Sequence, residues 1–315
     1  MFAFLLDYLD GLYPRLLKCN FFFGKNFFCR VILSCIYRLN NMLCWYYHNV
    51  KKTVLPSPED VDYVVSLTTY PARVDNLWKV LEIAFNQRDI SVRYAVCLWL
   101  IEEEFEGKEL PQQIKRLQDR GLQVRFEKEN LRCHNKYFYA FRNYPGKNII
   151  TIDDDLQYNH HTISALIQVH NEFPNSIVYN RGNKINRNGF KKFGSWIRYE
   201  EVGKNMLDVC PAGVGGVLYP PKSCSDLVLN AGVIKKTCLC ADDLWLNFMS
   251  RLLSTYTVYS GLVSAYIVLP DSDQSSALYL NNVKSEGGGN DIQIDNISEW
   301  AKTELGCDFY VNVNE

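Results

Sequence analysis

The sequence predicts an α/β fold in which helices flank a mainly parallel sheet, with a helical appendage at the amino-terminal end. From residue 61 onward, strand-like and helix-like stretches alternate, a pattern typical of parallel sheets covered on both faces. With 315 residues, 47% of them hydrophobic, the chain can bury one large core with a smaller appendage. We therefore expect an amino-terminal segment, residues 1–54, and a main domain, residues 55–315.

The predicted elements of the main domain follow in a regular order. Apolar runs such as YAVCLWL and NIITI indicate buried strands, and stretches such as NLWKVLEIAFNQ carry apolar residues at helical spacing. Gly121 ends one of the helices and Pro174 follows another. The predicted strands cover residues 61–67, 94–100, 122–128 and 148–152, and the predicted helices cover residues 76–87, 110–121, 136–144 and 161–173.

The amino-terminal segment differs from the rest in charge and composition. Residues 1–52 contain seven Lys or Arg and two Asp, a net charge of +5, so that the remainder carries −6 of the total of −1. Arg30 and Arg38 interrupt the apolar runs before they reach the ~18 residues that a membrane span needs, and no small-residue cleavage site of a signal peptide follows. The linker LPSPED ends the segment. A basic, aromatic-rich helix fits a membrane-surface anchor or a helix that packs on the main domain, and both alternatives stay open.

Charge and cysteine content exclude some classes of protein. A net charge of −1 gives no basic excess, so we expect no nucleic-acid partner. The 11 Cys lie among apolar residues without CxxC pairs, which indicates reduced thiols and a location in the cytoplasm, with attachment to the inner face of a membrane as an open option. Cys238 and Cys240 are close in sequence but have no further ligands nearby, so a zinc site is not expected.

The most informative stretch is TIDDDLQY, residues 151–158, which follows a predicted buried strand. Three adjacent carboxylates destabilise one another unless a cation or hydrogen-bond donors compensate them. If the extended conformation continues, Asp153 and Asp155 point to the same side, at the strand end where such sheets bind ligands. Two carboxylates suit Mn²⁺ or Mg²⁺. The alternative is an exposed acidic turn, or Asp155 as the cap of the next helix.

Together, VVSLTTYPAR, TIDDDLQY and ADDLWL occur in an order that resembles GT-A-fold glycosyltransferases of the family 2-like, polysaccharide-assembly type, over residues 61–300. The resemblance implies a Rossmann-like GT-A fold. It also implies metal-dependent transfer of a sugar, with inversion, from a nucleotide-sugar donor to a glycan or lipid-linked acceptor, a UDP-sugar being the favoured donor. Mn²⁺ or Mg²⁺ is the implied cofactor, and a membrane surface is a further possible partner.

The resemblance also implies roles for individual residues. Asp243 is the implied catalytic base, with Asp242 as a helix cap or acceptor ligand, and the helix dipole is expected to keep the base ionised. The competing interpretation is that one of the two Asp only caps the helix. The implied donor-binding residues are Thr68, Thr69, Tyr70, Arg73, Lys136 and Asp153, the implied metal ligands are Asp153 and Asp155, and the implied acceptor or sugar pocket contains Gly215, Gly216 and Trp196.

Some of these assignments have plain structural alternatives. The glycines of PAGVGGVLYPP, residues 211–221, allow close approach to a ligand but equally fit a tight turn before a strand. Trp196 can stack on a sugar ring, but an amphipathic aromatic side chain on a loop is weak evidence for such a role. All five His precede residue 171, so the role of a further metal ligand falls to Asp271, Asp273, Asp291, a water molecule or no group at all.

Three other functions are weighed against the transferase. A phosphohydrolase of the haloacid dehalogenase type needs a Thr or similar residue where this chain has Gln157. A sugar nucleotidyltransferase needs a glycine-rich, basic phosphate loop, and TTYPARV has none. A non-catalytic membrane-surface protein would leave both acidic clusters without a role.

Overall fold

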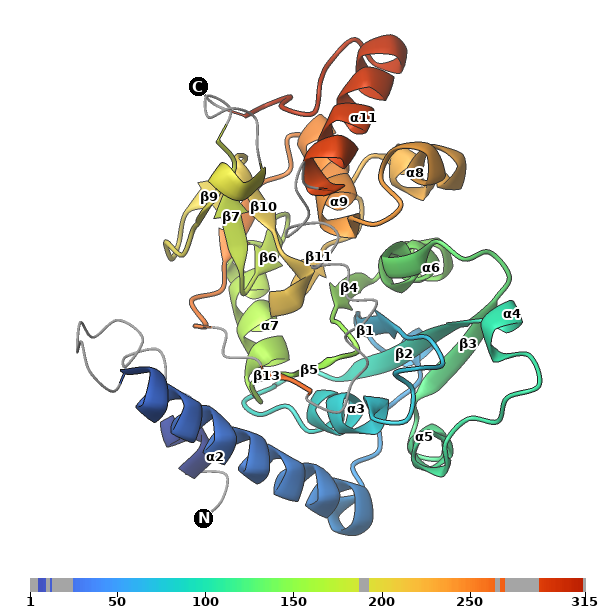
Figure 1. Ribbon diagram of the computed structural model, residues 1–315, viewed down its shortest axis with the longest axis vertical. Helices are drawn as coiled ribbons and strands as arrows, with labels where there is room; N and C mark the ends of the chain where they lie inside the picture. The colour runs from blue at the N-terminus through green and yellow to red at the C-terminus, as the bar shows by residue number, and fades with distance from the viewer. Residues whose placement is uncertain are drawn as a thin grey trace.

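The computed structural model describes residues 5–9, 12, 25–186, 193–263, 267–269 and 289–313 (Figure 1). Its centre is an eight-stranded sheet with the strand order β3-β2-β1-β4-β11-β6-β12-β9. The strands of this sheet are β1 (Tyr63–Thr68), β2 (Tyr94–Ile101), β3 (Gln123–Glu127), β4 (Asn148–Thr151), β6 (Ile177–Tyr179), β9 (Asn205–Met206), β11 (Val217–Tyr219) and β12 (Thr257–Tyr259).

The first half of the sheet is parallel and the second half is mixed. Strands β3, β2, β1 and β4 pair in parallel, as do β6 and β12, whereas β11 runs antiparallel between β4 and β6. Val217 at the start of β11 pairs with Thr151 at the end of β4. The antiparallel direction of β11 therefore brings the glycine-rich loop before it beside the acidic stretch after β4.

Helices cover both faces of the sheet and fill two cores (Figure 1). Side chains alternate between the cores along a strand, so that Val64 lies in one and Val65 in the other. The helices are α3 (Leu77–Phe85), α4 (Glu102–Phe105), α5 (Gln112–Gln118), α6 (Asn135–Asn143), α7 (Thr162–Glu172), α8 (Ala231–Thr237), α9 (Asp242–Leu252) and α11 (Gly289–Glu304), and the smaller sheets contain β5 (Leu156–Gln157) with β13 (Ile267–Val268), and β7 (Gly182–Lys184) with β8 (Ile197–Arg198) and β10 (Val209–Pro211).

The predicted order of strands and helices in the main domain is confirmed. Each of the four predicted strands and four predicted helices has a counterpart, and the helix predicted over residues 110–121 is shorter, at Gln112–Gln118. Gly121 ends this region with a φ of +104°, and a Cβ at this position would lie 2.2 Å from the carbonyl oxygen of Leu55. Glycine is therefore required where the linker crosses the main domain.

The amino-terminal segment packs along the main domain as the long helix α2 (Lys25–Tyr46), which continues as a π-helical turn over Tyr47–Lys51. Leu6, Ile36, Leu43 and Tyr47 form a small cluster of their own, and Cys44 joins a core of the main domain. None of the described helices has the length and hydropathy needed to cross a bilayer.

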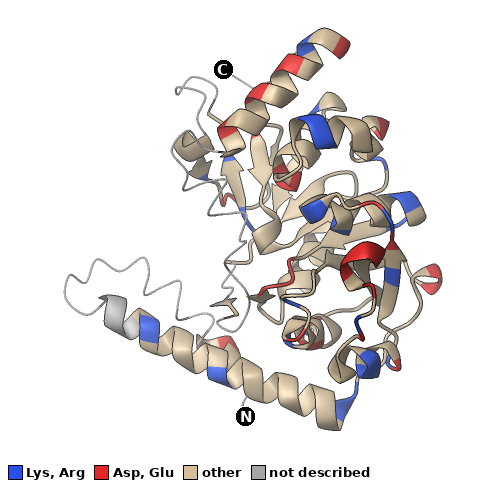
Figure 2. Ribbon diagram, turned by 45° about the vertical axis from the view of Figure 1, so that its right-hand side comes forward, with Lys and Arg blue, Asp and Glu red and all other residues tan. Residues whose placement is uncertain are grey.

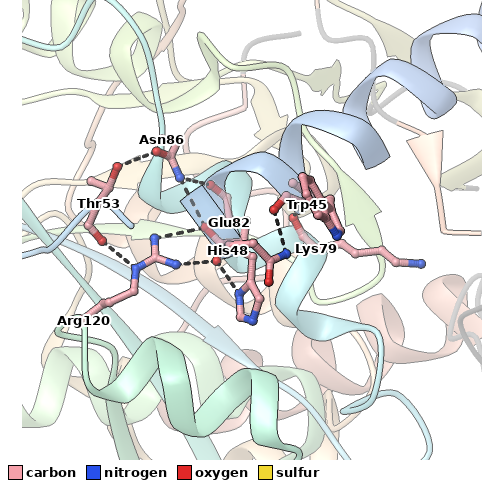
Figure 3. A network of polar contacts seen from close by, with 9 residues as sticks. Trp45, His48, Thr53, Lys79, Glu82, Asn86 and Arg120 are labelled. Carbon is pink, nitrogen blue, oxygen red and sulfur yellow. Dashed lines mark hydrogen bonds and ion pairs between the residues drawn. The ribbon is translucent and has the colours of Figure 1, made fainter. Parts of the chain in front are cut away.

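A buried polar network, which we call the Glu82 network, joins this segment to the main domain (Figure 3). Glu82 on α3 is fully buried, and its carboxylate lies 2.7 Å from His48 Nδ1 and 2.6 Å from Arg120 Nη1. Arg120 Nε donates to the carbonyl of Thr53 at 2.8 Å, and the Thr53 hydroxyl donates to Asn86 at 2.6 Å. Packing on the main domain is thus observed for one face of the segment.

Candidate active site

Lys136, in the first turn of α6, is the centre of the candidate site. Its Nζ lies 2.6 Å from Asp153 Oδ1 and 2.9 Å from Asp242 Oδ2. The side chain of Lys136 is only 7% exposed. Burial alone would lower the pKa of this ammonium group, but the carboxylates of Asp153, Asp242 and Asp243 raise it well above its usual value. Lys136 thus remains charged and joins the end of β4 to the start of α9.

The acidic stretch after β4 does not continue the strand. β4 ends at Thr151, and Asp154 and Asp155 form a turn before β5. The expectation that strand alternation places Asp153 and Asp155 on one side is therefore wrong, because Asp153 pairs with Lys136 whereas Asp154 and Asp155 both pair with Arg73. Burial raises the pKa of Asp153, and the charge of Lys136 partly offsets this effect.

Arg73, in the loop after β1, holds the second part of the acidic stretch. Its Nη1 lies 2.8 Å from Asp154 Oδ1 and 3.2 Å from Asp155 Oδ2. The Thr69 hydroxyl donates to Asp154 Oδ2 at 2.6 Å, and the guanidinium of Arg73 lies over the ring of Tyr70. The predicted donor-binding residues Thr69, Tyr70 and Arg73 are thus placed beside the carboxylates.

Two neighbours of this loop have other roles. The Thr68 hydroxyl donates to the carbonyl of Trp99 at 2.9 Å and so fixes β1 to β2.

Asp154 was not predicted as a site residue, yet it anchors the loop to the acidic stretch. Burial raises its pKa to about 6, against the lowering effect of Arg73. In the sequence, Asp154 could not be distinguished by residue type from Asp153 and Asp155 on either side of it.

Asp242 and Asp243 begin α9, as expected, but neither caps it. The position before the helix is Ala241, and no side chain caps the helix. Asp242 pairs with Lys136, whereas Asp243 Oδ1 accepts a hydrogen bond from the backbone N–H of Gly213 at 2.9 Å. The capping interpretation is therefore wrong for this pair.

The pKa values of the pair are shifted in opposite directions. Burial, together with the charge of Asp242, raises the pKa of Asp243 to about 8. Burial also acts against the charged form of Asp242, but Lys136 and His134 outweigh it and lower the pKa of Asp242. The expectation that the helix dipole keeps Asp243 ionised is thus wrong, because desolvation and the neighbouring charge are larger effects.

Gly213 is a site residue that the sequence analysis missed. A Cβ at this position would lie 3.0 Å from Asp243 Oδ1 and 3.2 Å from Lys136 Nζ. A side chain at this position would crowd both charged groups, so glycine eases the close approach of the loop before β11. The three glycines of the stretch were visible in the sequence, but their spacing did not show which one faces the carboxylates.

The three predicted pocket residues have turn or packing roles in the structure. Gly215 and Gly216 form a tight turn, in which a Cβ on Gly215 would lie 2.7 Å from Arg181 Cβ and Gly216 has a φ of +83°. This geometry favours the turn interpretation. Trp196 is only 7% exposed, and its ring stacks on Phe309 with ring centroids 6.2 Å apart. Its burial contradicts the expectation that it stacks on a sugar.

Asp153 and Asp155 lie close enough for the charge of Asp155 to raise the pKa of Asp153, and carboxylate oxygens are ligands that hard divalent cations prefer. The described residues contain no group of three or more His, Cys, Asp or Glu that could hold a metal ion. Mg²⁺ is usually bound by one or two carboxylates together with substrate phosphates, and such a site needs no larger protein cluster. Asp291 accepts a hydrogen bond from the Phe193 backbone N–H at 2.6 Å, and Asp271 and Asp273 lie outside the described residues.

The sequence comparison links this geometry to a known family. Residues 106–213 match glycosyl transferase family 2. The matched stretch contains Lys136, the acidic stretch and Gly213, and it ends before Asp242. The match confirms the resemblance to family 2 glycosyltransferases and the GT-A-like α/β class, and it supports a nucleotide-sugar glycosyltransferase as the class of enzyme.

Solved structures of S. aureus TarS 1–349 are similar to the chain. One matches with 13% identity and a TM-score of 0.45, covering 80% of this chain and 75% of that chain. Another, in complex with UDP-GlcNAc, matches with 12% identity and a TM-score of 0.44, covering 80% and 76%. No curated protein matches the sequence.

Proposed function

We propose that the chain is a metal-dependent, inverting glycosyltransferase that moves a sugar from a nucleotide-sugar donor, with a UDP-sugar favoured, to a glycan or lipid-linked acceptor in polysaccharide assembly. One observation carries the proposal. Lys136 pairs with Asp153 after β4 and with Asp242 at the start of α9, and thereby joins the proposed donor side to the helix end that carries Asp243, the proposed base. The cysteines of the described residues are free thiols and six of them are buried, which supports a cytoplasmic location.

On the donor side, the loop after β1 supplies the recognition groups. Thr69, Tyr70 and Arg73 lie against the acidic stretch, where a nucleoside diphosphate can place its phosphates near the guanidinium of Arg73. Asp153 and Asp155 would hold Mn²⁺ or Mg²⁺ together with the diphosphate. When bound, the cation supplies positive charge that stabilises the leaving group. Lys136 provides a further fixed positive charge at this end of the site.

On the acceptor side, Asp243 is the proposed base. The acceptor oxygen forms a bond to the anomeric carbon while the bond from that carbon to the diphosphate oxygen breaks, and Asp243 takes the proton of the acceptor hydroxyl. A base with a pKa near the working pH is efficient in such a transfer, and burial places the pKa of Asp243 at about 8. The Gly213 N–H holds one oxygen of this carboxylate in place. Attack from the face opposite the diphosphate inverts the configuration.

The first test replaces Asp153 and Asp155 together by Asn. We expect this variant to fold and to lose Mn²⁺-dependent binding of the donor, because the hard cation loses both charged ligands. Isothermal titration calorimetry with a panel of sugar nucleotides, with and without Mn²⁺, measures the effect and identifies the preferred donor. The exposed pair Asp60→Asn and Asp295→Asn, which removes the same charge elsewhere, should bind like the parent chain. Parental metal-dependent binding by the double Asp153/Asp155 variant would contradict the proposed site.

A second test uses Lys136→Met. The variant removes the shared positive charge and leaves Asp153, Asp242 and Asp243 as uncompensated neighbours, so the pKa values of the carboxylates should rise. We expect transfer to decrease at least tenfold at neutral pH and to recover in part at higher pH, an order of magnitude typical for a lost charged contact. The pH profile of kcat/KM measures this. A profile that keeps its shape and height would show that Lys136 does not set the charge of the base.

A third test follows the pKa of Asp243. Only the ionised carboxylate can accept a proton, so kcat/KM for transfer should rise with pH through an apparent pKa of about 8, which belongs to the Asp242 and Asp243 pair as a whole. In the unfolded chain an Asp has a pKa of ~3.9, so the folded state binds the extra proton between these two values. This group therefore makes the protein less stable as the pH rises through that window. Asp243→Asn should remove this part of the pH dependence of the melting temperature.

A further inference from the structure

The outer face of α2 is a surface that the main domain does not cover. Met42 is 51% exposed, Trp45 is 60% exposed and Tyr46 is 45% exposed. Val31, Cys35, Arg38, Met42 and Trp45 follow one another at spacings of four and three residues, and each is exposed, so they form one stripe along the helix. We propose that this stripe, with its basic neighbours, binds the surface of an anionic lipid bilayer.

The charge of the stripe selects this partner. Arg30, Arg38, Lys51 and Lys52 are exposed, and the sequence contains no Asp or Glu from residue 11 to residue 58. Figure 2 shows basic and uncharged residues along α2, with no acidic ones. Large apolar side chains between basic residues are typical of helices that lie in the interface of anionic membranes. In a dimer packed through this stripe, Arg38 of each copy would lie within the interface. The positive charges of the two copies would then repel each other, which disfavours a second copy as the partner.

The one acidic residue in the described part of the segment before α2 does not offset this charge. Asp7 lies 2.6 Å from Arg88 Nη1 and 3.4 Å from His161 Nε2, both on the main domain. The negative charge of Asp7 is therefore paired with basic groups on the side of the segment that faces the main domain. The outer side keeps its excess of positive charge.

The stripe is held in a fixed orientation relative to the candidate active site. The Glu82 network fixes the carboxyl-terminal end of the segment, and Cys44 Sγ donates to the carbonyl of Lys79 on α3 at 3.4 Å. Nearer the site, Gln157 donates to Asn41 Oδ1 at 2.8 Å, and Gln157 follows Asp155 by two residues. A bilayer bound to the stripe would therefore hold the active site at one angle to the membrane surface.

Binding to lipid vesicles by the full chain tests the proposal. We expect the protein to co-sediment with phosphatidylcholine vesicles that contain phosphatidylglycerol, but not with phosphatidylcholine alone, and to be released by salt. A basic residue near an anionic surface contributes about 1 kcal/mol, or roughly fivefold in binding, so the variant Arg30→Gln with Arg38→Gln should bind more than tenfold more weakly. Trp45→Ala should weaken binding at every salt concentration, because it removes apolar insertion rather than charge.

Matched controls separate this surface from general charge effects. Lys236→Gln with Lys302→Gln removes the same charge from α8 and α11, which lie at the opposite end of the molecule from α2 (Figure 1), and should bind vesicles like the parent chain. Equal binding to neutral and anionic vesicles, or no binding to either, would overturn the proposal. A dimer detected by light scattering and abolished by Trp45→Ala, without vesicle binding, would instead assign the stripe to a second copy. No donor is needed here, so the result is independent of the proposed transferase function.

Discussion

Replacing Asp243 by Asn is expected to lower kcat for sugar transfer by roughly 10²-fold or more, the usual effect of losing a general base. Asn keeps the shape of the side chain and an oxygen that can accept the hydrogen bond from the Gly213 N–H. Because the proposed donor contacts come from other residues, donor and Mn²⁺ affinity should change only a few-fold. Steady-state kinetics of transfer, together with calorimetric donor binding, measures both quantities.

The neighbouring Asp242→Asn variant provides the control for this assignment. Asp242 pairs with Lys136 rather than with Gly213. Its replacement should leave the positive charge of Lys136 less compensated and remove a neighbouring negative charge, and both effects lower the pKa of Asp243. Near-parental turnover by Asp243→Asn would refute Asp243 as the base. A large loss of kcat in Asp242→Asn alone, with near-parental turnover by Asp243→Asn, would move the base to Asp242.

The second large effect is expected at Glu82, far from the chemistry. Glu82→Ala would leave the guanidinium of Arg120 and the ring of His48 buried without their carboxylate partner. Removing one partner of a buried ion pair typically costs 3–5 kcal/mol, because the remaining charge stays desolvated. Urea unfolding should show a loss of about this size.

Two further variants show whether the effect of Glu82→Ala is specific to the Glu82 network. Glu299→Ala, at an exposed position on α11, should change the free energy of unfolding by less than ~0.5 kcal/mol. A chain that lacks residues 1–52 loses His48 and the whole of α2, and we expect it to aggregate or unfold. If Glu82→Ala instead unfolds at the parental urea concentration, the Glu82 network does not hold the segment to the main domain.

The order of strands and helices could be predicted because each element carries its own pattern. Runs such as YAVCLWL are buried along their whole length in a central strand, so local composition was sufficient. The acidic stretch was predicted as a site for a sound reason, since three carboxylates do need compensation. The compensating groups, Lys136 and Arg73, lie 17 and 81 residues away from their Asp partners, and only the fold shows which cation meets which carboxylate.

The errors have physical causes of the same kind. Alternation along a strand failed for Asp153 and Asp155 because the strand ends at Thr151, and strand ends are poorly defined by sequence. The helix dipole was overestimated at Asp243, because the degree of burial of a carboxylate depends on the elements that cover it. Trp196 was expected on an open loop, whereas Phe309, more than a hundred residues later, covers its ring.

The Glu82 network also determines when the amino-terminal helix can complete its folding during synthesis. Thr53 meets Arg120 across 67 residues of chain, so the helix leaves the ribosome well before its last partner has been made. At a rate of about 5–20 residues per second, this interval lasts roughly 3–13 s. During that time α2 exposes apolar side chains on both its inner and its outer face. Slower translation across residues 53–120 would lengthen this exposure and raise the risk of aggregation before the enzyme is complete.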